Sequence, residues 1–343
     1  MKSFRVHSAS WGQAVQGGTL AIHGDLRHET RLVIVRPRPG FFKLLFVVRG
    51  TILPRVLPHV LGVAALASLV VLTLKQGYLR LPVTSPAPLS LLGIALSIFL
   101  GFRNNACYDR WWEGRKQWGA LIIEVRAFTH AAIALLDDGT AELPVAGRQA
   151  ARRLVHRTIA FPYALAAHLR GQDATEDIGL YVSEPERSRV LASGNRPNAL
   201  LREHQVELAR LLREGRLTDI TWAALNERVH VMMSVFTACE RIRLTPLPFA
   251  YTVLLHRTAY LFCLLLPFGL AESMGWFTPV LSAMIAYTFF GLDLLSEELE
   301  EPFGNTPNDL PLLAMSRTAE INMLEALGEP QPEPLRPKDF ILG

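Results

Sequence analysis

The sequence predicts an all-α membrane protein with a large helical part outside the membrane. Half of the 343 residues are hydrophobic and only 19% are charged, against roughly 25% charged residues in soluble domains. Four apolar segments approach or exceed the length that crosses a bilayer. Between the second and the third, apolar residues such as Leu154, Phe161 and Leu169 recur at helical spacing, and no strand-like alternation occurs.

The first two apolar segments differ in length. Residues 52–74 include only two ionisable side chains, Arg55 and His59, and would form a helix of about 34 Å, enough to span a membrane. Residues 81–102 carry no charge, but three prolines interrupt their first part. We therefore expect this helix to begin near Leu89 and to hold a shorter apolar stretch than a typical spanning helix.

The last two segments contain or adjoin ionisable residues. Residues 244–271 are apolar apart from His256 and Arg257, and residues 273–292 carry no charge and precede Asp293. Ionisable groups inside a membrane are costly and point to function by default. The alternative is a structural ion pair between Arg257 and Asp293 on adjacent helices, which we favour over a proton or substrate relay.

Basic residues predict the orientation in the membrane. They gather before the first segment and just after the second, whereas the two short connections contain few or none. The positive-inside rule then places both termini and the middle region in the cytoplasm, with the protein in the cell membrane. The predicted parts are an N-terminal segment, the first two membrane helices, a cytoplasmic helical region, the last two membrane helices and a proline-rich extended tail: residues 1–51, 52–102, 103–243, 244–296 and 297–343.

The second segment presents two faces of interest. Three small residues lie four positions apart and allow another helix to approach closely: Gly93, Ser97 and Gly101. A bulky apolar stripe runs beside them at the same spacing: Ile94, Ile98 and Phe102. Such a stripe is usually ordinary helix packing, but in a ring of identical helices it would form an apolar constriction that can gate by dewetting.

Other functional classes find little support. The sequence contains no phosphate-binding glycine loop, no HExxH and no GxSxG motif, so we expect no enzyme and no cofactor. Histidines and the three cysteines lack paired metal-ligand spacing, so no metal site is expected. A basic stretch with three tryptophans follows the second segment, but Asp109 and Glu113 interrupt it, which argues against nucleic acid. Its tryptophans Trp111, Trp112 and Trp118 are typical of a membrane interface.

Three stretches together resemble the bestrophins, specifically the prokaryotic branch. The first is Phe-Leu-Gly-Phe-Arg-Asn-Asn-Ala-Cys-Tyr-Asp-Arg-Trp-Trp-Glu-Gly-Arg-Lys at 99–116. The second is Arg-Leu-Thr-Pro-Leu-Pro-Phe-Ala-Tyr at 243–251, and the third is Glu-Leu-Glu-Glu-Pro-Phe-Gly at 298–304, followed by Asn-Asp-Leu-Pro at 308–311. The resemblance covers about residues 36 to 327.

The resemblance implies a homopentameric ion channel with one central pore and four membrane helices in each subunit. The second helix would line a hydrophobic neck of Ile94, Ile98 and Phe102, so the resemblance favours the pore over ordinary packing for this stripe. A second constriction would lie at Ile220, at the cytoplasmic end of the pore. The tail would wrap neighbouring subunits. The partners implied are copies of the same chain, small monovalent ions and the lipid bilayer.

One departure from the family concerns calcium. In animal bestrophins, a cluster of aspartates after the Pro-Phe-Gly forms a calcium clasp. Residues 305–309 here read Asn-Thr-Pro-Asn-Asp, which leaves one acidic residue. We therefore predict no calcium-dependent opening. Anion conduction is the family default, but an uncharged neck does not specify the sign of the ion. A monovalent-cation channel stays an alternative, as do a secondary transporter and a membrane scaffold.

Overall fold

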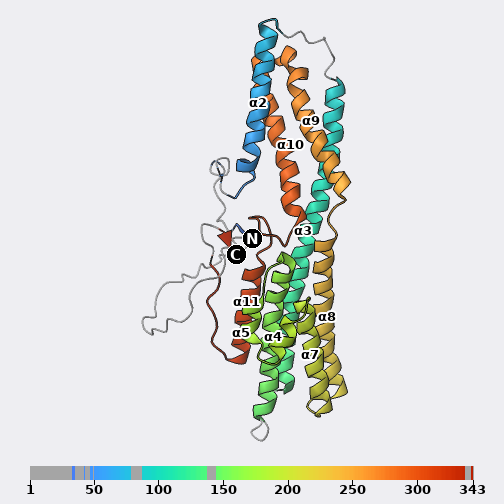
Figure 1. Cartoon of the computed structure of the whole chain (residues 1–343), viewed down its shortest axis with the longest axis vertical. Helices are drawn as coiled ribbons and strands as arrows, with labels where there is room; N and C mark the ends of the chain where they lie inside the picture. The colour runs from blue at the N-terminus through green and yellow to red at the C-terminus, as the bar shows by residue number, and fades with distance from the viewer. Residues whose placement is uncertain are drawn as a thin grey trace, which may run out of the picture.

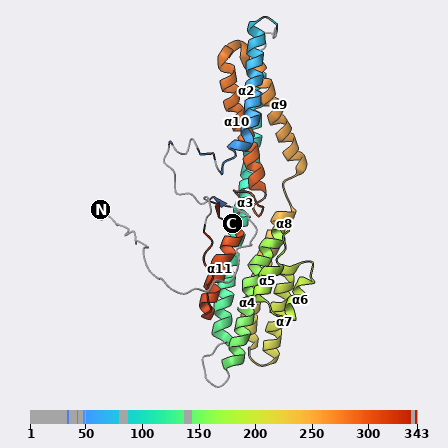
Figure 2. The same cartoon turned by 60° about the vertical axis from the view of Figure 1, so that its left-hand side comes forward.

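The chain folds into two helical bundles placed end to end, joined by one helix that runs through both (Figures 1 and 2). The computed structural model describes residues 33–34, 42, 47–48, 50–78, 87–136, 144–336 and 341–342. The predicted N-terminal segment 1–51 therefore lies mostly outside the described residues. The helices are α2 (Leu53–Lys75), α3 (Ala87–Leu136), α4 (Pro144–Arg170), α5 (Thr175–Tyr181), α6 (Glu186–Leu191), α7 (Arg196–Arg213), α8 (Asp219–Leu244), α9 (Phe249–Met274), the 3₁₀ turn η1 (Gly275–Phe277), α10 (Thr278–Glu300) and α11 (Leu312–Leu327).

The first bundle, here called the apolar bundle, consists of α2, the N-terminal half of α3, α9 and α10. The helix that the sequence predicts over 52–74 is present as α2. Helix α3 is 50 residues long, about 75 Å at 1.5 Å per residue. Its apolar half begins at Ala87, close to the predicted start at Leu89. A sharp turn at Gly275, whose φ is +50°, reverses the chain between α9 and α10.

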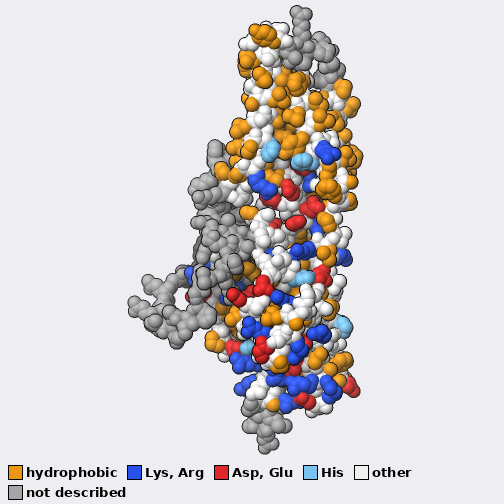
Figure 3. Space-filling model, viewed as in Figure 1, with side chains coloured by type: hydrophobic (Ala, Val, Ile, Leu, Met, Phe, Trp, Pro, Cys, Tyr) orange, Lys and Arg blue, Asp and Glu red, His pale blue; other side chains and the backbone are white. Residues whose placement is uncertain are grey.

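Within the described residues, three helical stretches are long and apolar enough to cross a membrane: α2, α3 and the continuous stretch from α9 through α10. Only a third of each apolar window is buried inside this single chain. Figure 3 shows hydrophobic side chains over most of the visible surface of the apolar bundle, and charged ones gathered on the other bundle. Exposed apolar surface of this extent needs lipid or another protein to cover it.

The second bundle, here called the polar bundle, packs α4 to α8 and α11 around the C-terminal half of α3. Its core includes fully buried side chains from several of these helices, such as Trp118, Phe128, Leu154 and Leu200. Helix α8 begins with a reciprocal hydrogen-bond cap between Thr218 and Thr221, which satisfies backbone groups at the helix start. The secondary structure of the described residues is therefore helical, as predicted, apart from the two-residue antiparallel pair β1 (Val33–Ile34) and β2 (Ile341–Leu342).

The tail after α10 differs from the prediction of an extended strap, because it contains α11. The prolines of the tail flank residues 312–327 and leave that stretch free of proline, so a helix can form there. Its buried residues Leu312, Ala319 and Met323 recur at helical spacing and pack in the core of the polar bundle. Gly328, at φ +68°, ends the helix in the left-handed conformation that glycine adopts at low cost.

Candidate functional site

The apolar stripe expected to form the neck lies on an uncovered face of α3. Ile94, Ile98 and Phe102 are 58%, 52% and 61% exposed. Between Leu96 and Val125, the buried residues of α3 recur at spacings of three, four or seven along the opposite side of the helix: Leu96, Leu100, Arg103, Cys107, Gly114, Trp118, Leu121 and Val125. At about 100° per residue, the two sets lie half a turn apart. The described residues therefore leave this stripe largely uncovered, and its place in a pore stays a prediction.

The small residues beside the stripe have different surroundings. A Cβ added to Gly93 would come within 3.0 Å of the Phe262 ring of α9, whereas one added to Gly101 would meet no atom within 4 Å. The exposed Ser97 hydroxyl donates to the Gly93 carbonyl at 2.8 Å. Of these three residues, Gly93 is the one that lies close to another described helix. Ile220, the expected second constriction, lies in the first turn of α8 and is 82% exposed.

The predicted pair between Arg257 and Asp293 is wrong, because Asp293 binds other partners. Its Oδ1 accepts a hydrogen bond from Nη1 of the buried Arg103 on α3. Its Oδ2 lies 2.6 Å from Nδ1 of His256 on α9. Helix rotation is the reason: Arg257 is exposed, while the neighbouring His256 is the side chain that reaches α10. Arg103 was visible in the sequence only as one of several charges after the second segment.

The three family-like stretches, far apart in sequence, meet around Arg110 where the two bundles join. Arg110 donates from Nε to the Glu300 carbonyl at 2.5 Å, from Nη1 to the Thr245 carbonyl at 2.5 Å and from Nη2 to the Ile242 carbonyl. The Glu300 carboxylate in turn accepts from the backbone N–H of Leu247 at 3.1 Å. One guanidinium thus connects α3 to the end of α8 and the end of α10. The sequence offered no signal for this role beyond the presence of Arg110 in the first stretch.

The loop between α10 and α11 packs on the middle of α3. Trp111 donates from Nε1 to the Asn308 carbonyl at 3.0 Å. A Cβ on Gly114 would meet the Phe303 ring at 3.2 Å, so the glycine permits a close approach. Trp118 is fully buried with its ring centroid 6.4 Å from that of Phe303. The interfacial role predicted for Trp118 is therefore wrong, since its indole ring belongs to the core of the polar bundle.

Asp309 is the one acidic residue in residues 305–309, the stretch compared above with the aspartate cluster of animal bestrophins. Its carboxylate is 1% exposed and accepts from the Thr306 N–H at 2.5 Å and from the Thr306 hydroxyl at 2.9 Å. Burial raises the pKa of Asp309 to about 6, although these hydrogen bonds and Arg170 act in the opposite direction. No group of three or more His, Cys, Asp or Glu side chains suited to a metal occurs among the residues that the structure describes. The absence of calcium-dependent opening stays a prediction.

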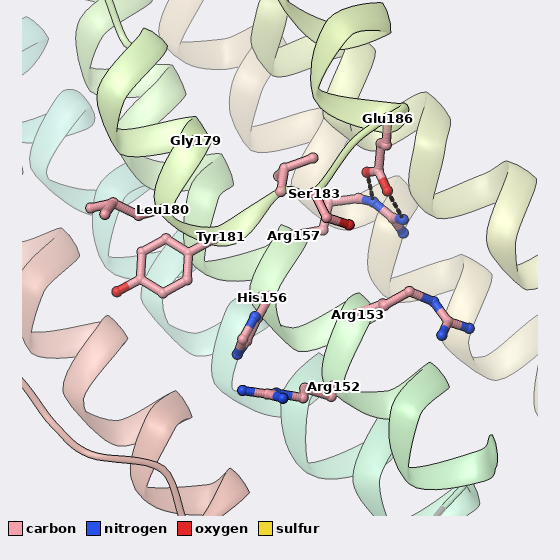
Figure 4. A pocket seen from close by; sticks show the side chains of 10 residues that line it. Arg152, Arg153, His156, Arg157, Gly179, Leu180, Tyr181, Ser183 and Glu186 are labelled. Atoms are coloured by element: carbon pink, nitrogen blue, oxygen red, sulfur yellow. Dashed lines mark hydrogen bonds and ion pairs between the residues drawn. The ribbon is translucent and has the colours of Figure 1, made fainter. Parts of the chain in front are cut away.

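A cavity of about 340 Å³ opens on the polar bundle between α4 and the α5–α6 turn (Figure 4). Its basic side chains all have acidic partners. Arg152 and His156 contact Glu329 at 2.6 and 2.8 Å, while Arg153 and Arg157 bind carboxylates of α7 and α6. This arrangement is a network of ion pairs that ties α4 to its neighbours and to the end of α11.

Known proteins resemble this chain along most of its length. Residues 33–325 match a family described as Bacterial/Fungal Bestrophin protein. The voltage-dependent anion channel-forming protein mll4386 of Mesorhizobium japonicum is 42% identical over 308 residues, covering 90% of this chain and 96% of its own. The voltage-dependent anion channel-forming protein YneE of Escherichia coli K12 is 40% identical over 294 residues, covering 85% and 93%. The crystal structure of a bacterial bestrophin homolog from Klebsiella pneumoniae superposes with a TM-score of 0.73 at 39% identity, covering 79% and 98%. This chain is therefore a membrane protein of the bestrophin family, in its bacterial and fungal branch.

Proposed function

We propose that this chain is one subunit of a homopentameric channel that passes small monovalent anions across the cell membrane. Four membrane helices per subunit would come from the apolar bundle: α2, the first half of α3, α9 and α10. Both termini and the polar bundle would lie in the cytoplasm. The pore would follow α3, with a neck of Ile94, Ile98 and Phe102 and a second constriction at Ile220.

The observation that carries this proposal is the uncovered stripe of α3. The neck residues occupy a face that no other described part of the chain covers, opposite a face that is continuously buried. A ring of such helices would close this stripe around an axis and place apolar side chains at its narrowest part. Apolar constrictions of this kind can gate by dewetting while they leave the ion chemically unbound.

The relatives support anions as the conducted species, because the two quoted above are named as anion channel-forming proteins. A monovalent cation is the second candidate. One observation favours it: the first ionisable residue past the neck on the exposed side of α3 is Asp109. A secondary transporter would be expected to show inverted repeats, and residues 52–102 and 244–292 share no such symmetry.

Replacing the neck residues together with Ala tests the proposal. The purified I94A/I98A/F102A variant should conduct at least severalfold more than the unchanged protein in a planar bilayer, because a wider and less apolar neck stays wet more often. The matched control replaces three exposed apolar residues of α2, Leu61, Leu69 and Leu72. We expect that variant to conduct as the unchanged protein does.

Two results would overturn the proposal. If the neck variant loses its assembled mass in detergent while the α2 control keeps it, the stripe is a packing surface. If the unchanged protein gives no single-channel steps at any voltage, the protein is a scaffold or a transporter. Light scattering of the purified complex should give a mass five times that of the chain.

A further inference from the structure

The exposed face of α3 continues beyond the neck into the polar bundle. Successive residues seven positions apart drift by only about 20° around a helix, so they form a nearly straight line. Starting from Phe102, this line passes through Asp109, Lys116, Ile123 and His130, and every one of these residues is exposed. The uncovered stripe therefore runs along most of α3, and two of its members carry full charges at neutral pH.

These two charges have no partner within the described chain. Neither Asp109 nor Lys116 forms a hydrogen bond or an ion pair with a described residue. In contrast, the charges on the flanks of the stripe are engaged: Arg110 binds three carbonyls, and Glu113 pairs with Arg241 of α8. Asp109 and Lys116 are thus the charged groups of this face that are free to interact with passing ions.

We propose that Asp109 shifts the charge selectivity of the channel toward cations and so limits its preference for anions, with Lys116 as a weaker opposing group; this inference rests on the proposed pore along α3. Five copies would form a ring of carboxylates on the cytoplasmic side of the neck and, one step further, a ring of ammonium groups. Rings of acidic side chains favour cations, and rings of basic side chains favour anions. Because the neck itself is uncharged, these two rings influence which sign of ion passes.

Distance decides which ring dominates at the neck. At 1.5 Å per residue, Asp109 lies about 10 Å along α3 from Phe102, and Lys116 lies about 21 Å away. The Debye length at physiological ionic strength is about 8 Å. Both distances exceed this length, so both fields are screened at the neck, but the carboxylate ring keeps about a quarter of its unscreened potential there and the ammonium ring less than about a tenth. Asp109 favours cations at the narrowest point and limits the share of anions in the current.

Reversal potentials in a gradient of sodium chloride test this inference. We expect D109N to raise the chloride-to-sodium permeability ratio at least threefold, and D109K to raise it further. K116Q should change the ratio in the opposite direction and by less than twofold. The control is E325Q, which removes an exposed carboxylate of α11 on a different surface and should leave the ratio unchanged. Lower ionic strength should enlarge the effect of D109N, because screening weakens.

The outcomes separate the inference from the proposed function. If the unchanged protein conducts and D109N and D109K leave its reversal potential where it was, Asp109 does not face the ion path and the inference is wrong. If D109N lowers the chloride-to-sodium ratio, the assigned sign is wrong. If the unchanged protein conducts no ions, the proposed function fails and the inference fails with it.

Discussion

Replacement of Asp293 with Asn should destabilise the apolar bundle strongly. Arg103 is 2% exposed, and its closest acidic partner is Asp293. The second carboxylate near Arg103 belongs to Glu300, at 3.9 Å from Nη2, which is at the limit of an ion pair. The D293N variant would thus leave a buried guanidinium with one distant counter-charge. Removal of one partner from a buried pair costs about 3–5 kcal/mol.

The residual attraction of Glu300 places the expected loss at the lower end, about 3 kcal/mol. At about 2.1 cal/mol/K of unfolding entropy per residue, a 343-residue chain loses about 1.4 °C of Tm per kcal/mol, so D293N should lower the Tm by about 4 °C. The double variant R103M/D293N should recover more than half of that loss, because it removes the buried charge as well as its partner.

Thermal unfolding in detergent with a thiol-reactive dye suits this measurement, since Cys107, Cys239 and Cys263 are all buried and become reactive on unfolding. The control is E113Q, which breaks an ion pair between side chains that are 37% and 65% exposed. An exposed pair contributes about 0–1 kcal/mol. If D293N shifts the Tm no more than E113Q does, or if the double variant is less stable than D293N, the buried pair is not what stabilises this junction.

Two further predictions concern the tail. Glu320 of α11 accepts hydrogen bonds from Tyr163 and Tyr181 and pairs with the buried Arg317 at 2.9 Å. E320Q should therefore lower the free energy of unfolding by about 3 kcal/mol and speed amide hydrogen exchange in α11. Equal exchange rates in E320Q and in the exposed-site control E325Q would contradict this. Asp309 has a native pKa of about 6 against an ordinary 3.8, so the native state keeps a proton that the unfolded state loses. The stabilisation is complete below pH 3.8 and disappears as the pH rises through about 6, so the Tm difference between the unchanged protein and D309N should fall across this window and stay flat above pH 7. A constant difference from pH 4 to pH 7 would refute the assignment.

Some features of the fold can be predicted from the sequence because they depend on local composition. An apolar run of sufficient length predicts a helix wherever it lies, and α2 and the apolar half of α3 begin within two residues of the expected positions. No proline occurs in residues 89–136, which permits the single helix α3 to continue through the charged stretch. The helix α11 was not predicted, because the prolines on both sides of residues 312–327 suggested an extended tail throughout.

Contacts between helices could not be predicted from the sequence in the same way, because they join residues that are far apart in the chain. Arg103 and Asp293 are 190 positions apart, and Arg110 reaches carbonyls more than 130 positions away. Whether Arg257 or His256 faces α10 depends on a rotation of about 100° around α9, which packing decides. Trp118 looks in the sequence like its neighbours Trp111 and Trp112, yet only Trp118 is enclosed by the core.

The sequence by itself determined that this chain is helical, that four of its segments are apolar, and that one of those segments carries an apolar stripe with period four. These properties follow from the local period of the helix and from the cost of moving each side chain out of water. Only the tertiary structure decided that this stripe is the uncovered face of a 50-residue helix and that Asp109 and Lys116 continue it. The reason is that exposure is a property of what packs on the opposite side, and those residues come from helices distant in the sequence.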